Sequence, residues 1–269
     1  GTAGANGWYT SDVTATFTAT DGLSGFASGT TQTGTATTSG EGTNLTVGSP
    51  AFTDLAGNTA PAGSPTSPAF KVDKSDPTNV TFVGGPSDEA GYYFGAVPGA
   101  PTCTAEDAVS GLASCLVTGH NTGVGSHTLT ATATDNAGRR STATLSYTVR
   151  AWNTKGFYSP VDMGGVLNSV KGGSTVPLKF EVFAGVAPAG ELTTTTAIGA
   201  SIKYAKISCD GSAPVDEIET LASGSTALRF DDTSGQFVYN WKTPTGAGCY
   251  RATVYLADGS SIWANFKTR

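Results

Sequence analysis

The chain has 269 residues, a formal net charge of −6 and only 13% charged residues, and 38% of its residues are hydrophobic. It has no basic run, which argues against a nucleic-acid partner. It also has no apolar stretch near the roughly 18 residues that suggest a membrane-spanning helix. Its 36 glycines, 13 prolines and abundant threonines favour many short strands joined by turns. We therefore predict an all-β protein of two or three small domains.

Two stretches of the chain repeat each other at an offset of roughly 80 residues. The first copy reads TATDGLSGFAS at 18–28, and the second reads TAEDAVSGLAS at 104–114. The other shared landmarks are FTDLAGN (52–58) with ATDNAGR (133–139), and GWY (7–9) with GYY (91–93). Three landmarks in the same order predict a duplicated domain.

Each copy alternates apolar and polar residues with a period of two, which is typical of half-buried strands. The clearest examples are residues 13–19 and 128–134. The boundary between the copies is predicted at 71–77, where a strand ends and Pro77 keeps the preceding residue extended. The second copy has a strand-like opening at 79–83. The first copy begins only six residues before its own GWY landmark, so we expect it to lack its first strand.

Residues 151–269 do not repeat this pattern and contain longer strand-like runs. The expected strands are 174–183, 202–208, 227–230, 236–241, 251–256 and 261–266. Asp258-Gly259 lies between the last two, and Asp-Gly is a strong hairpin signal. We predict three tandem β-sandwich domains, at 1–73, 74–150 and 151–269.

The four cysteines divide into one pair in each of two predicted domains: Cys103 with Cys115, and Cys209 with Cys249. Neither pair has the Cys-x-x-Cys spacing of zinc or thioredoxin-like sites. Two disulfides formed in an oxidising compartment are the favoured interpretation. The alternative is four buried free thiols.

The landmarks resemble known bacterial modules. GWYTSDVTATFTATD and TDLAGN resemble immunoglobulin-like (Ig-like) repeats of large secreted proteins of Gram-positive bacteria, especially actinobacteria. CTAEDAVSGLASC resembles the cysteine-containing version of that repeat. Residues 156–269 resemble the PxKF module, through GFYSPVD (156–162), VKGGSTVPLKF (170–180), YNWKT (239–243) and ANFK (264–267).

This resemblance implies three tandem Ig-like sandwiches that act as appended, non-catalytic modules of a secreted or cell-surface protein. It implies a parent catalytic or surface domain on the N-terminal side of residue 1. It also implies that Arg269 lies close to the natural C-terminus.

The sequence offers little catalytic chemistry. His120 and His127 lie in a glycine-rich stretch, and we expect them to be solvated turn residues rather than members of a catalytic triad. Asp231 and Asp232 fall on a predicted hairpin turn, where turn chemistry is favoured over a glycosidase carboxylate pair. No catalytic residue, cofactor site or metal ligand is assigned, and the chain is not expected to be an enzyme.

Four aspartates at repeated positions allow two interpretations. They are Asp21, Asp54, Asp107 and Asp135. Carboxylates beside turn carbonyls can bind calcium, but aspartate is also the residue that a hydrogen-bonded turn needs. The turn interpretation is favoured, with weak calcium binding at most.

Aromatic residues also allow two interpretations. Trp8, Tyr9, Tyr92, Tyr93, Trp152 and Tyr158 are candidates for a sugar-binding platform. Four of them belong to the repeat landmarks, which favours packing. The favoured function is therefore a structural spacer and anchor. The alternatives are a carbohydrate-binding appendage of a polysaccharide-degrading enzyme, and a subunit of an extracellular assembly with like subunits as partners.

Overall fold

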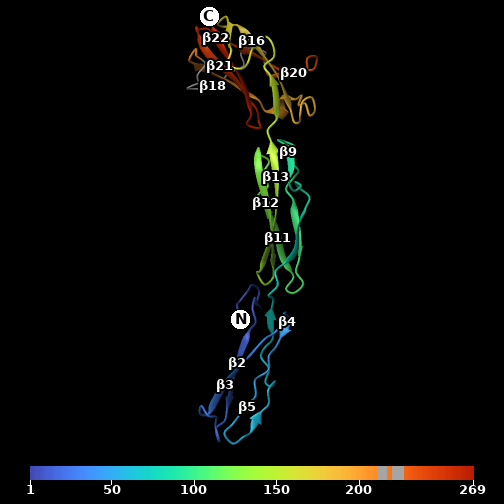
Figure 1. The fold of residues 1–269 in the computed structure, drawn as a ribbon, viewed down its shortest axis with the longest axis vertical. Coiled ribbons are helices and arrows are strands. Elements are labelled where there is room, and N and C mark those ends of the chain that lie inside the picture. The colour runs from blue at the N-terminus through green and yellow to red at the C-terminus, as the bar shows by residue number, and fades with distance from the viewer. Residues whose placement is uncertain (211–216, 220–226) are drawn as a thin grey trace. The chain divides into compact units, whose positions relative to one another are not determined.

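The computed structural model describes residues 1–210, 217–219 and 227–269 (Figure 1). Strands make up nearly all of the regular secondary structure in these ranges, and the helix there is the four-residue α1 (Thr195–Ile198). The prediction of an all-β fold class is confirmed for these residues.

Contacts divide the chain into two compact units. Unit 1 comprises residues 1–88, 98–120 and 128–146, and unit 2 comprises residues 89–97, 121–127 and 147–269. The three domain boundaries expected from the sequence stay a prediction.

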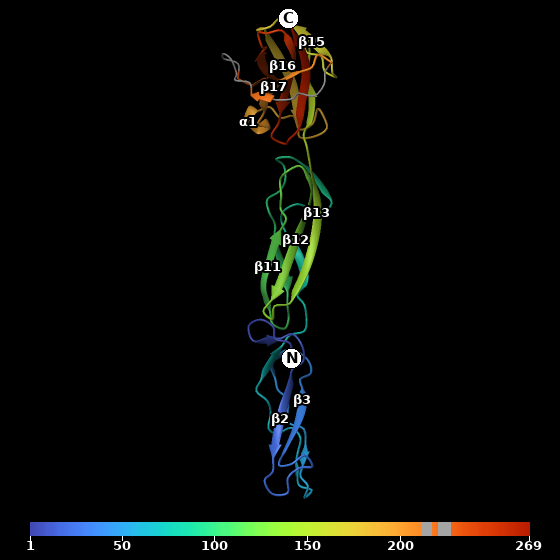
Figure 2. The ribbon, with the colours of Figure 1, turned by 90° about the vertical axis from the view of Figure 1, so that its left-hand side faces the viewer.

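Short strands form residues 1–73 of unit 1. They are β1 (Trp8–Tyr9), β2 (Thr14–Thr20), β3 (Thr31–Thr37), β4 (Gly42–Leu45), β5 (Phe52–Thr53), β6 (Thr59–Ala60) and β7 (Phe70–Val72). β2 and β3 pair antiparallel from Thr14↔Thr37 to Thr20↔Thr31 (Figure 2). The threonines of β2 are exposed while the residues between them are half-buried, as the period-two alternation predicts. The other sheets have the orders β1-β7-β4 and β5-β6.

The next segment holds two sheets, β10-β8 and β11-β12-β13-β9. Their strands are β8 (Thr78–Val83), β9 (Ala90–Tyr93), β10 (Thr102–Glu106), β11 (Leu112–Thr118), β12 (Gly125–Asp135) and β13 (Arg140–Arg150). Along β12, Leu129, Ala131 and Ala133 are buried at every second position. The same alternation directs the side chain of Asp135 inward at the end of the strand. The carboxylate of Asp135 therefore lies on the same buried face of β12 as Leu129, Ala131 and Ala133.

Residues 153–268 form two larger sheets, β14-β16-β20-β19 and β15-β22-β21-β17-β18. Their strands are β14 (Asn153–Gly156), β15 (Leu167–Val170), β16 (Thr175–Phe183), β17 (Ser201–Ile207), β18 (Glu217–Glu219), β19 (Arg229–Asp231), β20 (Gln236–Lys242), β21 (Gly248–Tyr255) and β22 (Ser261–Thr268). Five of the six expected strands match β16, β17, β20, β21 and β22 within a few residues, and the sixth overlaps β19. The expected hairpin turn is present, with Gly259 at φ +84° and Leu256 N–H bonded to the Ser260 carbonyl at 2.9 Å.

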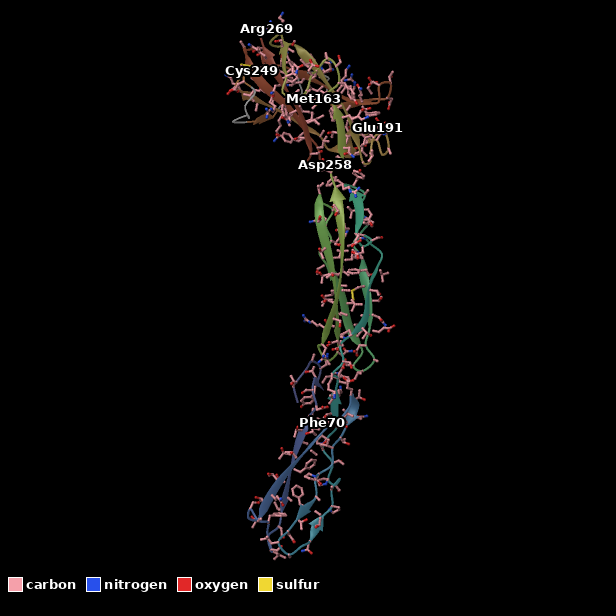
Figure 3. The ribbon with its side chains drawn as sticks, in the orientation of Figure 1. Phe70, Met163, Glu191, Cys249, Asp258 and Arg269 are labelled. Carbon is pink, nitrogen blue, oxygen red and sulfur yellow. A yellow bond between two sulfur atoms is a disulfide. The ribbon has the colours of Figure 1, made fainter. Side chains whose placement is uncertain are left out.

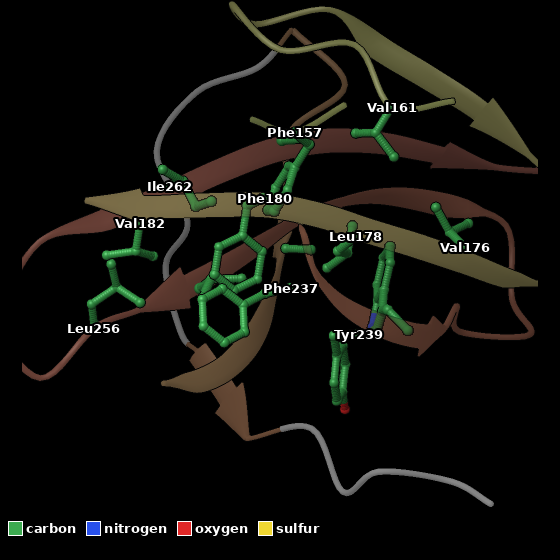
Figure 4. Close-up of a cluster of buried hydrophobic side chains, with 14 of the residues drawn as sticks. Phe157, Val161, Val176, Leu178, Phe180, Val182, Phe237, Tyr239, Leu256 and Ile262 are labelled. Atoms are coloured by element: carbon green, nitrogen blue, oxygen red, sulfur yellow. The ribbon is translucent and has the colours of Figure 1, made fainter. Parts of the chain in front are cut away.

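These two sheets enclose one apolar core, so the described part of residues 153–268 is a β-sandwich (Figure 4). β16 and β20 contribute Phe180 and Phe237, whose rings stack with their centroids 5.5 Å apart. On the same core, Trp241 of β20 meets Phe266 of β22 edge to face at 4.8 Å. Large rings from both sheets therefore interlock, as sandwich cores require.

Candidate functional site

Three aspartates meet in unit 1. Asp73 directly follows β7, Asp107 directly follows β10, and Asp135 is the last residue of β12. One carboxylate oxygen from each lies within 4.8 Å of the other two. Asp107 and Asp135 are two of the four aspartates that the sequence singles out for calcium. Asp73 was missed, because it belongs to no repeated landmark.

One oxygen of each carboxylate is held by its own local turn. Asp107 Oδ1 accepts the backbone N–H groups of Ser110 at 2.9 Å and Gly111 at 2.7 Å. Asp135 Oδ1 accepts the N–H of Arg139 at 2.9 Å. Asp73 Oδ1 accepts the N–H of Ser75 at 3.0 Å. The hydrogen-bonded turns expected at these residues therefore account for one oxygen of each carboxylate and leave the other to be explained.

The second oxygens of Asp73 and Asp135 are buried and have no hydrogen-bond partner. The two side chains are 0% and 1% exposed. The nearest cations along the chain are engaged elsewhere: Lys74 pairs with Asp12 at 3.0 Å, and Arg139 pairs with Asp76 at 2.8 Å. An ionised oxygen that is buried without a partner is strongly unfavourable.

Burial raises the pKa of Asp135, and the negative charges of Asp73 and Asp107 raise it further. Backbone hydrogen bonds from Arg139 and Gly138 act in the opposite direction. The site therefore disfavours the negative charge of Asp135 unless something positive compensates it.

Asp54 occupies the equivalent position in the first copy of the repeat, and its environment is different. Its Oδ1 accepts the N–H of Asn58 at 2.7 Å, and its Oδ2 accepts the side-chain amide of Asn58 at 2.8 Å. The side chain of Asn58 is the main cause of a lowered pKa at Asp54. Arg139 replaces this asparagine in the second copy and pairs with Asp76 instead. One substitution in the landmark thus removes the amide partner that the Oδ2 atom has in the first copy.

Asp21, the counterpart of Asp107, is also satisfied locally. Its Oδ1 accepts the N–H of Leu23 and its Oδ2 accepts the Ser24 hydroxyl, both at 2.8 Å. The structure therefore brings Asp107 and Asp135 together with Asp73, and it leaves Asp21 and Asp54 as turn residues.

The opposite pKa shifts of Asp135 and Asp54 predict opposite pH responses in metal-free buffer. The folded state holds the Asp135 proton to a higher pH than the unfolded state. The stability of wild type relative to Asp135→Asn should therefore fall as the pH rises from about 4 through the raised pKa. The lowered pKa of Asp54 gives a contribution that is present above about pH 4 and is lost as the pH falls.

Thermal unfolding of wild type, Asp135→Asn and Asp54→Asn across this pH range measures both differences. The same sign of pH dependence for the two substitutions would contradict this assignment.

The other candidate polar residues have structural contacts. A ring nitrogen of His120 lies 2.9 Å from the carbonyl oxygen of Pro98, and one of His127 lies 2.6 Å from that of Gly123. His127 lies within β12 and is half-buried, so the expectation of a solvated turn residue is wrong for it. Asp231 is in the expected turn, where the N–H of Thr233 is the main cause of its lowered pKa.

The aromatic candidates are packed. Every Trp, Tyr and Phe lies within the described ranges and is buried or half-buried. Trp8 and Trp152 are each 7% exposed. Within unit 2, the Trp152 ring N–H donates to the Phe94 carbonyl at 2.9 Å, and Tyr158 donates to the Glu181 carboxylate. Burial, reinforced by this bond, raises the pKa of Tyr158 to about 12. These side chains form no exposed platform.

All four cysteines are in disulfides, Cys103–Cys115 and Cys209–Cys249. The first joins β10 to β11 and so links the two sheets of residues 78–150. The second joins the residues just after β17 to β21, near the Cys249 label in Figure 3. Within the described ranges, no helix is both long and apolar enough to cross a bilayer.

Comparison with known proteins gives structural neighbours alone. No family model matches this chain, and no curated protein matches it. Among solved structures it is similar to extracellular domains 3–5 of Drosophila OTK, at 14% identity over 88% of this chain and 75% of that chain, with a TM-score of 0.23. It is also similar to a chimeric titin Z1Z2-Z1Z2 tandem, at 14% identity over 71% of this chain and 98% of that chain, with a TM-score of 0.23. Immunoglobulin domains 1–4 of Sidekick-1 are similar at 11% identity over 97% of this chain and 72% of that chain, with a TM-score of 0.22. The fold class itself follows from the strands and sheets of the chain.

Proposed function

We propose that this chain is a non-catalytic structural tandem of an extracellular protein, which spaces and anchors the domain that carries the activity. The observation that carries this proposal is a direct, bonded junction inside unit 1. The N–H of Ala5 donates to the Ala137 carbonyl at 2.8 Å, and the Asn6 side chain donates to the Asn136 carbonyl at 3.0 Å. These bonds join the start of the first copy to the β12–β13 turn of the second.

The connector between the two copies is also held in place. Asp76, within the connector, forms the ion pair with Arg139. Glu41 of the first copy accepts the N–H of Lys74 and the hydroxyl of Ser75. A connector fixed at several points transmits position better than a flexible tether does, which suits a spacer.

The disulfides and the resemblances of the sequence support the finer assignment. Disulfides persist in oxidising compartments, which agrees with a secreted or cell-surface location. The PxKF-like residues 156–269 and the Ig-like repeats before them favour appended modules of an actinobacterial secreted protein. The main partner is then the parent catalytic or surface domain on the N-terminal side of residue 1.

The spacer and the carbohydrate-binding alternative make different predictions. The chain is expected to pass through cellulose, chitin, xylan and peptidoglycan without retention, because its aromatic rings are packed and sugar binding by stacking needs an exposed ring. A depletion assay with each insoluble glycan measures this, with an unrelated disulfide-bonded Ig-like protein as the background control. Retention on any one glycan above that control would replace the spacer with a carbohydrate-binding appendage.

A further inference from the structure

We propose that Asp73, Asp107 and Asp135 bind one calcium ion. The three carboxylate oxygens lie within 4.8 Å of one another. Calcium binds oxygens at about 2.3–2.6 Å, so two ligands on opposite sides of the ion are about 4.6–5.2 Å apart. The three separations, all at or below 4.8 Å, do not exceed the largest separation that two calcium ligands can have, so the cluster is compact enough for calcium.

The buried oxygens supply an independent reason for a cation. The Oδ2 atoms of Asp73 and Asp135 are buried and have no hydrogen-bond partner, whereas the Oδ1 atom of each accepts a backbone N–H; Arg139 Nε is also buried without a partner. Three carboxylates in one place carry up to three negative charges, and Lys74 and Arg139 pair with other acids. A divalent cation compensates most of this charge and gives both orphaned oxygens a ligand bond. Water and backbone carbonyls complete the six to eight ligands that calcium takes.

The first copy of the repeat shows what the same landmark does when no ion is needed. There the Asn58 side-chain amide donates a hydrogen bond to Asp54 Oδ2 at 2.8 Å, and the Ser24 hydroxyl donates one to Asp21 Oδ2 at 2.8 Å. In the second copy Arg139 stands in place of Asn58 and pairs with Asp76, and Asp135 Oδ2 has no hydrogen-bond partner. The chain therefore contains its own matched control.

The ligands come from both copies of the repeat. Asp73 ends the first copy, whereas Asp107 follows β10 and Asp135 ends β12 in the second. The ion would therefore cross-link the start of the connector to the β12–β13 turn, and its binding energy would add to the stability of unit 1. This goes beyond the proposed function, which stands without calcium.

Titration of the full, metal-stripped chain with calcium chloride in a calorimeter tests the site. We expect one ion per chain with a Kd of about 0.1–1 mM, the range of extracellular calcium modules. In 10 mM calcium the melting temperature of unit 1 should rise by about 3–10 °C. Among the described residues, the cluster that could hold a metal lies in unit 1, so the unit 2 transition should not move. Magnesium chloride at the same concentration should produce a much smaller shift.

Two substitutions separate calcium binding from general stability. Asp135→Asn should weaken calcium binding at least tenfold, because ligand charge sets the affinity. It should also raise the melting temperature of the metal-free chain, since it removes a buried charge that repels Asp73 and Asp107. Asp54→Asn is the matched control and should leave the calcium affinity unchanged.

Arg139→Asn is the second test, because it restores the asparagine of the first copy. It should weaken calcium binding by offering Asp135 Oδ2 an amide partner. No heat and no melting shift up to 10 mM calcium would overturn the proposal. So would an unchanged affinity in Asp135→Asn, or an equal response to magnesium. In those cases the three aspartates are turn residues that hold no metal, and the glycan experiment still decides the proposed function.

Discussion

Phe180→Ala is expected to lower the free energy of unfolding of unit 2 by about 3–5 kcal/mol. Phe180 is 0% exposed, stacks on Phe237 and contacts Phe157 edge to face with centroids 6.3 Å apart (Figure 4). Its loss removes a ring from the core and leaves a cavity, because the pairing of β16 with β20 holds the strand in place. Denaturant unfolding measures this change in the free energy of unfolding, and calorimetry measures the shift of the transition.

Val186→Ala is the control for this prediction. Val186 is 77% exposed and belongs to the same unit, so its truncation should change the stability by no more than about 0.5 kcal/mol. Because the chain divides into two compact units and the cluster around Phe180 belongs to unit 2, Phe180→Ala should move the unit 2 transition and leave the unit 1 transition in place. A loss below 1 kcal/mol, or an equal shift of both transitions, would contradict the core described for residues 153–268.

Removal of the Cys209–Cys249 disulfide is expected to have an effect of similar size. The bond closes a loop with a sequence separation of 40 residues, and the chain-entropy model gives about 4 kcal/mol for a loop of that length. The double substitution Cys209→Ala and Cys249→Ala should therefore lower the free energy of unfolding of unit 2 by about 4 kcal/mol. Urea unfolding under non-reducing conditions measures it.

The other disulfide provides the comparison. Cys103–Cys115 closes a loop with a separation of only 12 residues, for which the same model gives about 3 kcal/mol. Its removal should therefore be less damaging than the removal of Cys209–Cys249, and added reductant should have no further effect on a chain that lacks both bonds. If the short loop proves the more important one, entropy of the unfolded chain is not the main contribution of these disulfides.

The sequence predicts the strands well because their signal is local. Alternation with a period of two depends on neighbouring residues alone, and it marks β2 and β12 within a few residues of their observed ends. The Asp258-Gly259 turn is equally local, since Asp258 Oδ1 accepts the N–H and hydroxyl of Ser260 in the same turn. The position of Asp258 beside this turn is labelled in Figure 3.

The sequence could not decide the role of the aromatic residues. Their positions in the chain were compatible both with packing and with a sugar-binding platform. The choice depends on what lies opposite each ring, such as Phe70 against Tyr9 at 5.9 Å or Tyr147 against Tyr92 at 6.2 Å. In each of these pairs the two rings are more than 50 positions apart in the sequence. Exposure is a property of the folded chain, and the tertiary structure decided it in favour of packing.

For the aspartate cluster, too, the sequence determines one part of the arrangement and the tertiary structure the other. By itself the sequence determined that Asp107 and Asp135 lie where strands end and turns begin, because the hydrogen bonds of those turns lie within four residues. Only the tertiary structure placed Asp73 beside them and sent Arg139 to Asp76, since both arrangements join residues that are far apart in the chain. A turn motif fixes one oxygen of its aspartate locally. What meets the other oxygen depends on which strand ends the fold brings together.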